Sequence, residues 1–151
     1  MPIRVLMVCL GNICRSPLAE GILAAKVSDR EILVDSAGTA GYHIGKSPDP
    51  RSIEIAAKHG IDISHQRCRR FSPADFDKYD YIFAMDRENL MNLQDLARDP
   101  RDFKKLSLLL EEAGMDAEEV PDPYYGGVQG FLEVYRMIDH ATDRLLATLL
   151  R

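Results

Sequence analysis

The sequence has no apolar run long enough to cross a lipid bilayer, since a membrane-spanning helix needs about 20 such residues in a row. It also has no signal-peptide pattern, because residues 1–4 lead straight into a strand-like run without a charged segment or a cleavage site. Internal repeats, low-complexity tracts and linkers are missing as well. We therefore expect a single domain over residues 1–151, located in the cytoplasm and without a membrane partner.

Cysteine is scarce, with only Cys9, Cys14 and Cys68 in the chain. An odd number of cysteines argues against a framework of disulfide bonds, and in a reducing compartment it favours a reactive thiol. A zinc site is not expected either, because Cys9 and Cys14 are spaced more widely than the usual pair of thiolate ligands. The sequence thus predicts neither a metal nor a cofactor.

Positive charge is also in short supply, because the formal net charge at pH 7 is −5. The only concentrated basic cluster, Arg67, Arg69 and Arg70, is short and fits a solvated surface better than a docking patch. A nucleic acid is therefore not expected as a partner. With 46% hydrophobic and 28% charged residues, the composition is that of an ordinary globular protein that buries about two-thirds of its unfolded surface.

Strand-like and helix-like segments alternate along the chain. Strands are predicted for residues 3–9, 31–36 and 79–85, with a short further strand at the start of the apolar run 105–110. A long amphipathic helix ends the chain, and its apolar stripe consists of Phe131, Tyr135, Ile138, Thr142, Leu145 and Leu149. The alternation predicts an α/β fold of three layers, in which helices cover both faces of a central, twisted, four-stranded parallel sheet.

The segment from Cys9 to Ser16 carries the strongest chemical signal. Cys9 directly follows the first predicted strand, and Arg15 and Ser16 precede a helix with Pro17 in its first turn. Ligands of parallel sheets bind at the carboxyl ends of the strands, where this cysteine is expected. Backbone amides, the positive end of the helix and the Arg15 guanidinium would stabilise a thiolate and bind a phosphate dianion. The alternative is a cysteine that is merely buried at a strand end.

Three further segments match motifs that occur together with such a loop in one protein family. Asp122-Pro123-Tyr124-Tyr125 matches the acid loop, more than a hundred residues downstream of residues 9–16, and residues 35–39 and Met85-Asp86 match other motifs. With these segments, the chain resembles a bacterial-type member of the low-molecular-weight protein tyrosine phosphatase family over essentially its whole length.

The resemblance implies hydrolysis of phosphotyrosine, and of small aryl phosphates, through a cysteinyl-phosphate intermediate on Cys9. Arg15 and the loop amides would bind the phosphate, and Asp122 would protonate the phenolate leaving group and then deprotonate the attacking water. Without the resemblance, Asp122 is better explained as the start of a turn before Pro123.

The resemblance also assigns supporting roles. Asn12 is expected to hold an unusual backbone conformation and to form hydrogen bonds with Ser36 and His65. Asp86 is expected to orient the Arg15 guanidinium. Without the resemblance, His65 is an ordinary surface histidine and Asp86 is a helix cap, although capping and orienting are compatible roles.

The rim of the site is expected to determine the substrate. Tyr124 and Tyr125 can stack on a phenyl ring or simply pack within their loop. Tyr42 occupies a wall position that is often tryptophan in bacterial-type members. The expected substrate-binding residues are Leu10, Gly11, Asn12, Ile13, Cys14, Ser16, Tyr42, Tyr124 and Tyr125.

Cys14 is the second thiol within the loop. In the family, such a neighbour can form a reversible disulfide with the nucleophile, which protects it from irreversible oxidation. Whether Cys9 and Cys14 form this bond here stays open at the level of sequence. The expected partner is a phosphotyrosine-containing protein, with a tyrosine kinase as one candidate, and the expected assembly is a monomer or a weak dimer.

Three other functions fit parts of the sequence. A protein-arginine phosphatase shares the scaffold, but such family members carry threonine at the position of Ile13, so isoleucine favours an aryl phosphate. Arsenate reduction on the same scaffold needs further cysteines around residues 80–90, where none occurs. A non-catalytic phosphotyrosine-binding module would be expected to lose Cys9 or Asp122, and both are present.

Overall fold

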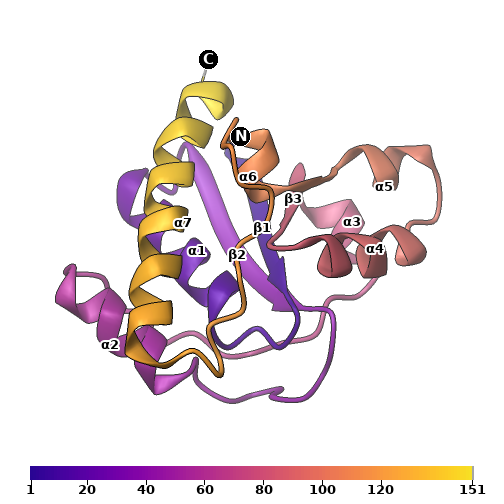
Figure 1. Cartoon of the computed structure of the whole chain (residues 1–151). Helices are drawn as coiled ribbons and strands as arrows, with labels where there is room; N and C mark the ends of the chain where they lie inside the picture. The colour runs from indigo at the N-terminus through magenta and orange to yellow at the C-terminus, as the bar shows by residue number, and fades with distance from the viewer. Residues whose placement is uncertain (151) are drawn as a thin grey trace.

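The computed structural model describes residues 1–150, whose strands form one parallel sheet in the order β2-β1-β3-β4 (Figure 1). The strands are β1 (Ile3–Cys9), β2 (Ile32–Gly38), β3 (Tyr81–Ala84) and β4 (Leu106–Leu108). The helices are α1 (Arg15–Lys26), α2 (Pro50–Lys58), α3 (Asp75–Lys78), α4 (Arg87–Leu96), α5 (Pro100–Lys104), α6 (Leu109–Glu112) and α7 (Gly127–Leu149). The predicted α/β class and the four-stranded parallel sheet are confirmed.

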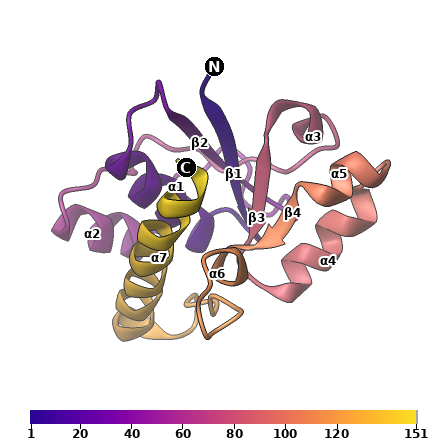
Figure 2. The ribbon, with the colours of Figure 1, turned by 90° about the horizontal axis from the view of Figure 1, so that it is seen from above.

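Strand β1 supplies side chains to two hydrophobic cores. Val5 and Met7 lie in the core shared with α1, α2 and α7, whereas Leu6 and Val8 lie in the core beneath α3 and α4. Figure 2 shows α1, α2 and α7 on one side of the sheet and α3, α4 and α5 on the other. Because both faces are covered, the central strand is a continuous apolar run rather than an alternating one.

The segment bounds differ from the sequence prediction where tertiary contacts decide them. Strand β2 continues to Gly38, which pairs with Cys9. Gly38 lies close to the loop that follows Cys9, since an added Cβ would be 2.7 Å from the Leu10 carbonyl oxygen. Strand β3 begins two residues later than predicted, since Tyr79 caps α3 through its backbone N–H. The run at 105–110 divides into β4 and the short helix α6.

Helices α2 and α5 begin with the same Asp-Pro-Arg sequence. Asp49 and Asp99 are the N-cap residues, and each carboxylate accepts the backbone N–H of the arginine two residues later. Proline suits the first helical position because that position needs no N–H donor. The capping sequence of α5 was thus present in the chain, although no helix was predicted there.

The predicted apolar stripe of the last helix is confirmed, and each of its residues is buried in α7. In this way α7 closes the core on the α1 and α2 side of the sheet (Figure 1). Within residues 1–150, the structure contains no helix that combines the length and the apolar character required to span a membrane.

The contribution of α7 to stability is testable at Leu145, which is 0% exposed. We expect Leu145→Ala to lower the free energy of unfolding by about 2–5 kcal/mol, because it leaves a cavity in the core. Leu150, at the end of the same helix, is 45% exposed, so Leu150→Ala should change stability by about 0.5 kcal/mol or less. Urea unfolding followed by circular dichroism measures both, and equal losses would contradict this packing.

Candidate active site

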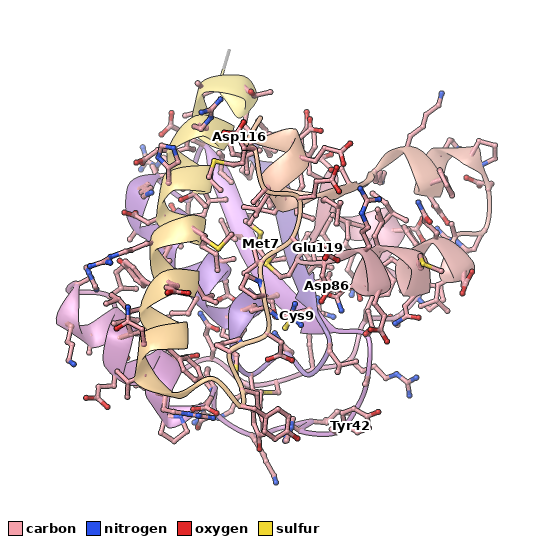
Figure 3. The ribbon with its side chains drawn as sticks, in the orientation of Figure 1. Met7, Cys9, Tyr42, Asp86, Asp116 and Glu119 are labelled. Carbon is pink, nitrogen blue, oxygen red and sulfur yellow. The ribbon has the colours of Figure 1, made fainter. Side chains whose placement is uncertain are left out.

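The predicted catalytic residues meet at the carboxyl end of the sheet. Cys9 is the last residue of β1, Arg15 is the first of α1, and residues 10–14 form the loop between them. Asp86 follows β3 as the N-cap of α4. Figure 3 shows Cys9 and Asp86 at this same end of the sheet. Cys9 and Arg15 are 2% and 3% exposed, so the nucleophile candidate and its cation are almost completely shielded from water.

Several backbone N–H groups of the loop have no hydrogen-bond acceptor among the described residues. Within residues 1–150, the N–H groups of residues 11–16 donate to no protein acceptor. Helix α1 begins at the end of this loop, and its N-cap residue, Cys14, makes no capping hydrogen bond through its side chain. Free amides and the positive end of a helix together favour an anion. This arrangement suits a phosphate group.

Arg15 joins the loop to the other side of the site. Its Nη1 donates to Asp86 Oδ2 at 2.6 Å and to the Val120 carbonyl at 3.0 Å, and its Nη2 lies 3.8 Å from Asp122 Oδ2. Burial opposes the charged guanidinium, but the neighbouring Cys9, Asp86 and Asp122 outweigh it and raise the pKa of Arg15. Arg15 therefore remains a cation within the protein.

Asp86 has both of the roles expected for it. One carboxylate oxygen accepts from Arg15, and the other accepts the backbone N–H of Asn89 at 2.8 Å and so caps α4. The cap fixes the carboxylate, and the carboxylate orients the guanidinium. The helix start and the site are thus coupled through one side chain.

Asn12 holds the middle of the loop. Its φ of 57° is the only positive φ among the non-glycine residues that the structure describes, which confirms the unusual backbone expected for it. Its Nδ2 donates to Ser16 Oγ at 2.9 Å and to Ser36 Oγ at 3.0 Å. Its Oδ1 accepts the backbone N–H of Arg69 at 3.0 Å. Asparagine tolerates the left-handed region better than most residues, and its amide here anchors that conformation.

The predicted hydrogen bond between Asn12 and His65 is wrong. His65 is exposed, and the segment after it passes the loop so that the Arg69 amide takes the acceptor oxygen of Asn12. The same segment brings in Cys68, whose thiol donates to the Asn12 carbonyl at 2.8 Å. From the sequence, Arg69 is expected on a solvated surface and Cys68 is expected to be structural or incidental. Their bonds to Asn12 depend on how an irregular segment crosses the loop.

Ser16 joins Asn12 to Cys9 through its hydroxyl group. Ser16 Oγ accepts from Asn12, so its own hydrogen is free for Cys9 Sγ at 3.0 Å or for the more distant Ala37 carbonyl at 3.5 Å. The shorter contact is to the sulfur. Ser16 Oγ is therefore hydrogen-bonded to Cys9 Sγ, and either atom can be the donor.

Glu20 extends this network and was missed in the sequence. Ser36 Oγ donates to Glu20 Oε1 at 2.7 Å, while it accepts from Asn12. Burial raises the pKa of Glu20 to about 7; Asp35 adds to the shift, whereas the bond from Ser36 and the charge of Arg69 oppose it. The one available signal was position, because Glu20 lies one helical turn after Ser16 on the same face of α1.

Asp122 lies at the edge of the site with its side chain half-exposed. Its Oδ1 accepts the Tyr124 backbone N–H at 3.0 Å, and its Oδ2 is the oxygen nearest to Arg15. It therefore does start a turn before Pro123, as its sequence context suggested, and this turn leaves the second oxygen facing Arg15.

The expected rim residues differ in how far they are covered. Tyr125 is 96% exposed and Tyr42 is 72% exposed, whereas Tyr124 is only 38% exposed. Figure 3 places Tyr42 away from Cys9, on the loop that follows β2. Tyr42 packs edge-on against His43, and a Cβ on Gly11 would lie 3.3 Å from the His43 ring. His43, which the sequence analysis did not select, therefore contacts the loop more closely than Tyr42 does.

The three cysteines are free and buried. Burial, together with the charges of Asp49 and Cys9, raises the pKa of the Cys14 thiol. A disulfide between Cys9 and Cys14 stays a prediction. Within residues 1–150, no group of three or more His, Cys, Asp or Glu side chains is arranged to hold a metal ion.

Comparison with known proteins places this chain in a family. A family model described as low molecular weight phosphotyrosine protein phosphatase matches residues 4–151. The chain belongs to this family. The predicted family and the expected enzyme class, a protein tyrosine phosphatase, are thereby confirmed.

Individual relatives agree with this assignment. The low molecular weight protein-tyrosine-phosphatase YfkJ of Bacillus subtilis is 43% identical over 153 residues, which cover 97% of this chain and 96% of the relative. The crystal structure of YfkJ matches with a TM-score of 0.92 and covers 99% of this chain and 96% of its own. A structure named DARP, drosophila arginine phosphatase, is 37% identical with a TM-score of 0.89, and the match covers 97% of each chain.

The raised pKa of Glu20 predicts a pH-dependent stability. Its pKa in the folded protein, about 7, exceeds the ordinary carboxyl value of 4.5, so the folded state holds the proton more tightly than the unfolded chain. The stability that Glu20 contributes is fully present at a pH below its pKa in the unfolded chain. It is lost as the pH rises through the pKa in the folded protein. Between about pH 5 and about pH 8, we expect the free energy of unfolding of the wild type to fall by on the order of 2 kcal/mol because of this group. Glu20→Gln should lack this decrease, because glutamine does not titrate.

Urea unfolding at both pH values measures this difference. Glu133→Gln, at an exposed position on α7, is the control and should keep the pH dependence of the wild type. An equal dependence in the wild type and Glu20→Gln would contradict the role given to burial.

Proposed function

We propose that the chain hydrolyses phosphotyrosine in protein substrates through a cysteinyl-phosphate intermediate on Cys9. The observation that carries this proposal is the convergence of Cys9, Arg15 and Asp122 around a loop with unused backbone donors. A phosphate in this loop would receive hydrogen bonds from the amides and from the Arg15 fork, beside the sulfur that attacks it.

In the first step the Cys9 thiolate attacks phosphorus, an S–P bond forms, and the bond from phosphorus to the phenolic oxygen breaks. The leaving phenolate takes a proton from the Asp122 carboxyl group. Ser16 donates to the thiolate in the resting enzyme, and Arg15 balances charge on the phosphoryl oxygens during transfer.

In the second step the Asp122 carboxylate takes a proton from a water molecule, whose oxygen attacks the phosphorus bound to Cys9. The S–P bond breaks, and the products are inorganic phosphate and the Cys9 thiolate. The enzyme returns to its starting state with Asp122 protonated, so the same carboxyl group is acid and then base.

An aryl phosphate is the proposed substrate class. Ile13 gives the loop an apolar wall, and the tyrosine rings of the acid loop offer faces for a phenyl ring. Arginine phosphatase activity is the second candidate, because a similar structure carries that name. A tyrosine kinase as partner, a monomeric or weakly dimeric state, a single domain and a cytoplasmic location complete the proposal.

Aryl phosphate hydrolysis at mildly acidic pH tests the roles of Cys9 and Asp122. We expect Cys9→Ser to abolish turnover while inorganic phosphate still binds. Asp122→Ala should slow hydrolysis by about 10²-fold or more for poor leaving groups and least for good ones, since a good leaving group needs little protonation.

Asp116 supplies a matched control in the same segment, because it is exposed and lies far from Cys9 (Figure 3). Asp116→Ala should keep wild-type rates. Residual turnover in Cys9→Ser would contradict the mechanism. Faster release of phosphate from a phosphoarginine peptide than from a phosphotyrosine peptide would replace the proposed substrate with the second candidate.

A further inference from the structure

The two Asp-Pro-Arg segments of the chain offer an internal comparison. In both, the N-cap carboxylate accepts from the arginine backbone N–H at 2.8 Å, and it also accepts from the arginine side chain. Arg101 is 88% exposed, whereas Arg51 is 35% exposed. Because the two arginines make capping contacts of the same kind, capping does not explain the lower exposure of Arg51. Additional contacts must cover its side chain.

The additional contacts of Arg51 are to two aromatic rings. Its guanidinium carbon lies 4.5 Å from the centroid of the Phe131 ring and 5.4 Å from that of Tyr124. Both distances are within the range of a cation–π attraction. Phe131 belongs to α7, and Tyr124 belongs to the acid loop. Arg51 thus connects the start of α2 to the segment that carries Asp122.

The start of α2 is bonded to the phosphate-binding loop on its other side. The Asp49 N–H donates to the Ile13 carbonyl at 2.8 Å, and Ser52 Oγ donates to the Cys14 carbonyl at 3.3 Å. Asp49 is only 8% exposed and holds Arg51 with both carboxylate oxygens. The Asp49–Arg51 pair is therefore anchored on the catalytic loop.

Tyr124 transmits this anchoring to the proposed acid. Its backbone N–H donates to Asp122 Oδ1, so the position of Tyr124 fixes the turn that aims the carboxyl group. The separation of 3.8 Å between Asp122 and Arg15 is too long for a hydrogen bond. The acid therefore depends on contacts outside the loop for its position.

We propose that Arg51 is a positioning residue that holds the acid loop over the phosphate-binding loop through the face of Tyr124. This role rests on the proposed function, since it acts through Asp122. When Arg51 is removed, the acid loop is free to move, and proton transfer to the leaving group suffers while phosphate binding and attack by Cys9 remain.

The test compares substrates with poor and good leaving groups, phenyl phosphate and a nitrophenyl phosphate. We expect Arg51→Met to lower kcat/KM, which reports the steps up to departure of the leaving group, about tenfold for phenyl phosphate and less than about twofold for the nitrophenyl ester, with inhibition by phosphate unchanged. Arg51→Lys keeps the charge but loses the fork, and should fall between Arg51→Met and the wild type. The matched control, Arg101→Met, should behave as the wild type.

A double-mutant cycle separates positioning from a general loss of structure. In the Asp122→Ala background, Arg51→Met should have no further effect on phenyl phosphate, because the acid it positions is gone. Equal slowing of both substrates, or additive effects in the double mutant, would overturn the role of Arg51. Wild-type turnover that persists in Cys9→Ser would instead refute the proposed function, so the two failures are distinguishable.

Discussion

The conformation of the proposed phosphate-binding loop, residues 10–14, depends on the side chain of Asn12. Its backbone lies in the left-handed region, and its amide group is hydrogen-bonded to Ser16, Ser36 and the Arg69 backbone. These partners come from α1, β2 and an irregular segment that also bonds the loop through Cys68. A conformation that asparagine merely tolerates in isolation is thus held by contacts from distant parts of the chain.

A second constraint is the buried charge of Arg15. Removing one partner of a buried ion pair typically costs about 3–5 kcal/mol, because the other charge is left uncompensated. Here Asp86 and the Val120 carbonyl compensate the guanidinium, and Asp122 lies beyond hydrogen-bonding distance. The Arg15 guanidinium therefore links the loop to Asp86, which follows β3, and to Val120, which precedes the acid loop. The proposed phosphate would complete the set of acceptors.

Local patterns in the sequence were enough to predict the main parts of this structure. The apolar run of β1, the stripe of α7 and the position of Cys9 between a strand and a helix depend on neighbouring residues, and the structure agrees with each. The resemblance to a family added Asp122, which its sequence context alone marks only as a turn residue. The capping pattern at Asp99 was equally local and was overlooked, because its helix has little apolar periodicity.

The side-chain contacts around the site could not be predicted, because they depend on how segments far apart in the chain pack together. His65 was assigned a bond that the Arg69 backbone makes, and nothing in the sequence reveals which residue of an irregular segment faces Asn12. Glu20 looks like a surface residue of α1 until β2 brings Ser36 against it. Arg51 has a local twin in Arg101, so only the fold distinguishes the two.

Trapping the proposed cysteinyl-phosphate tests whether Cys9 is the nucleophile. The Asp122→Ala variant is mixed with a nitrophenyl phosphate, quenched with acid within the first turnovers, and digested for mass spectrometry. We expect a phosphate on the sulfur of Cys9. A phosphate on any other residue, or turnover with no phosphorylated protein, would contradict it.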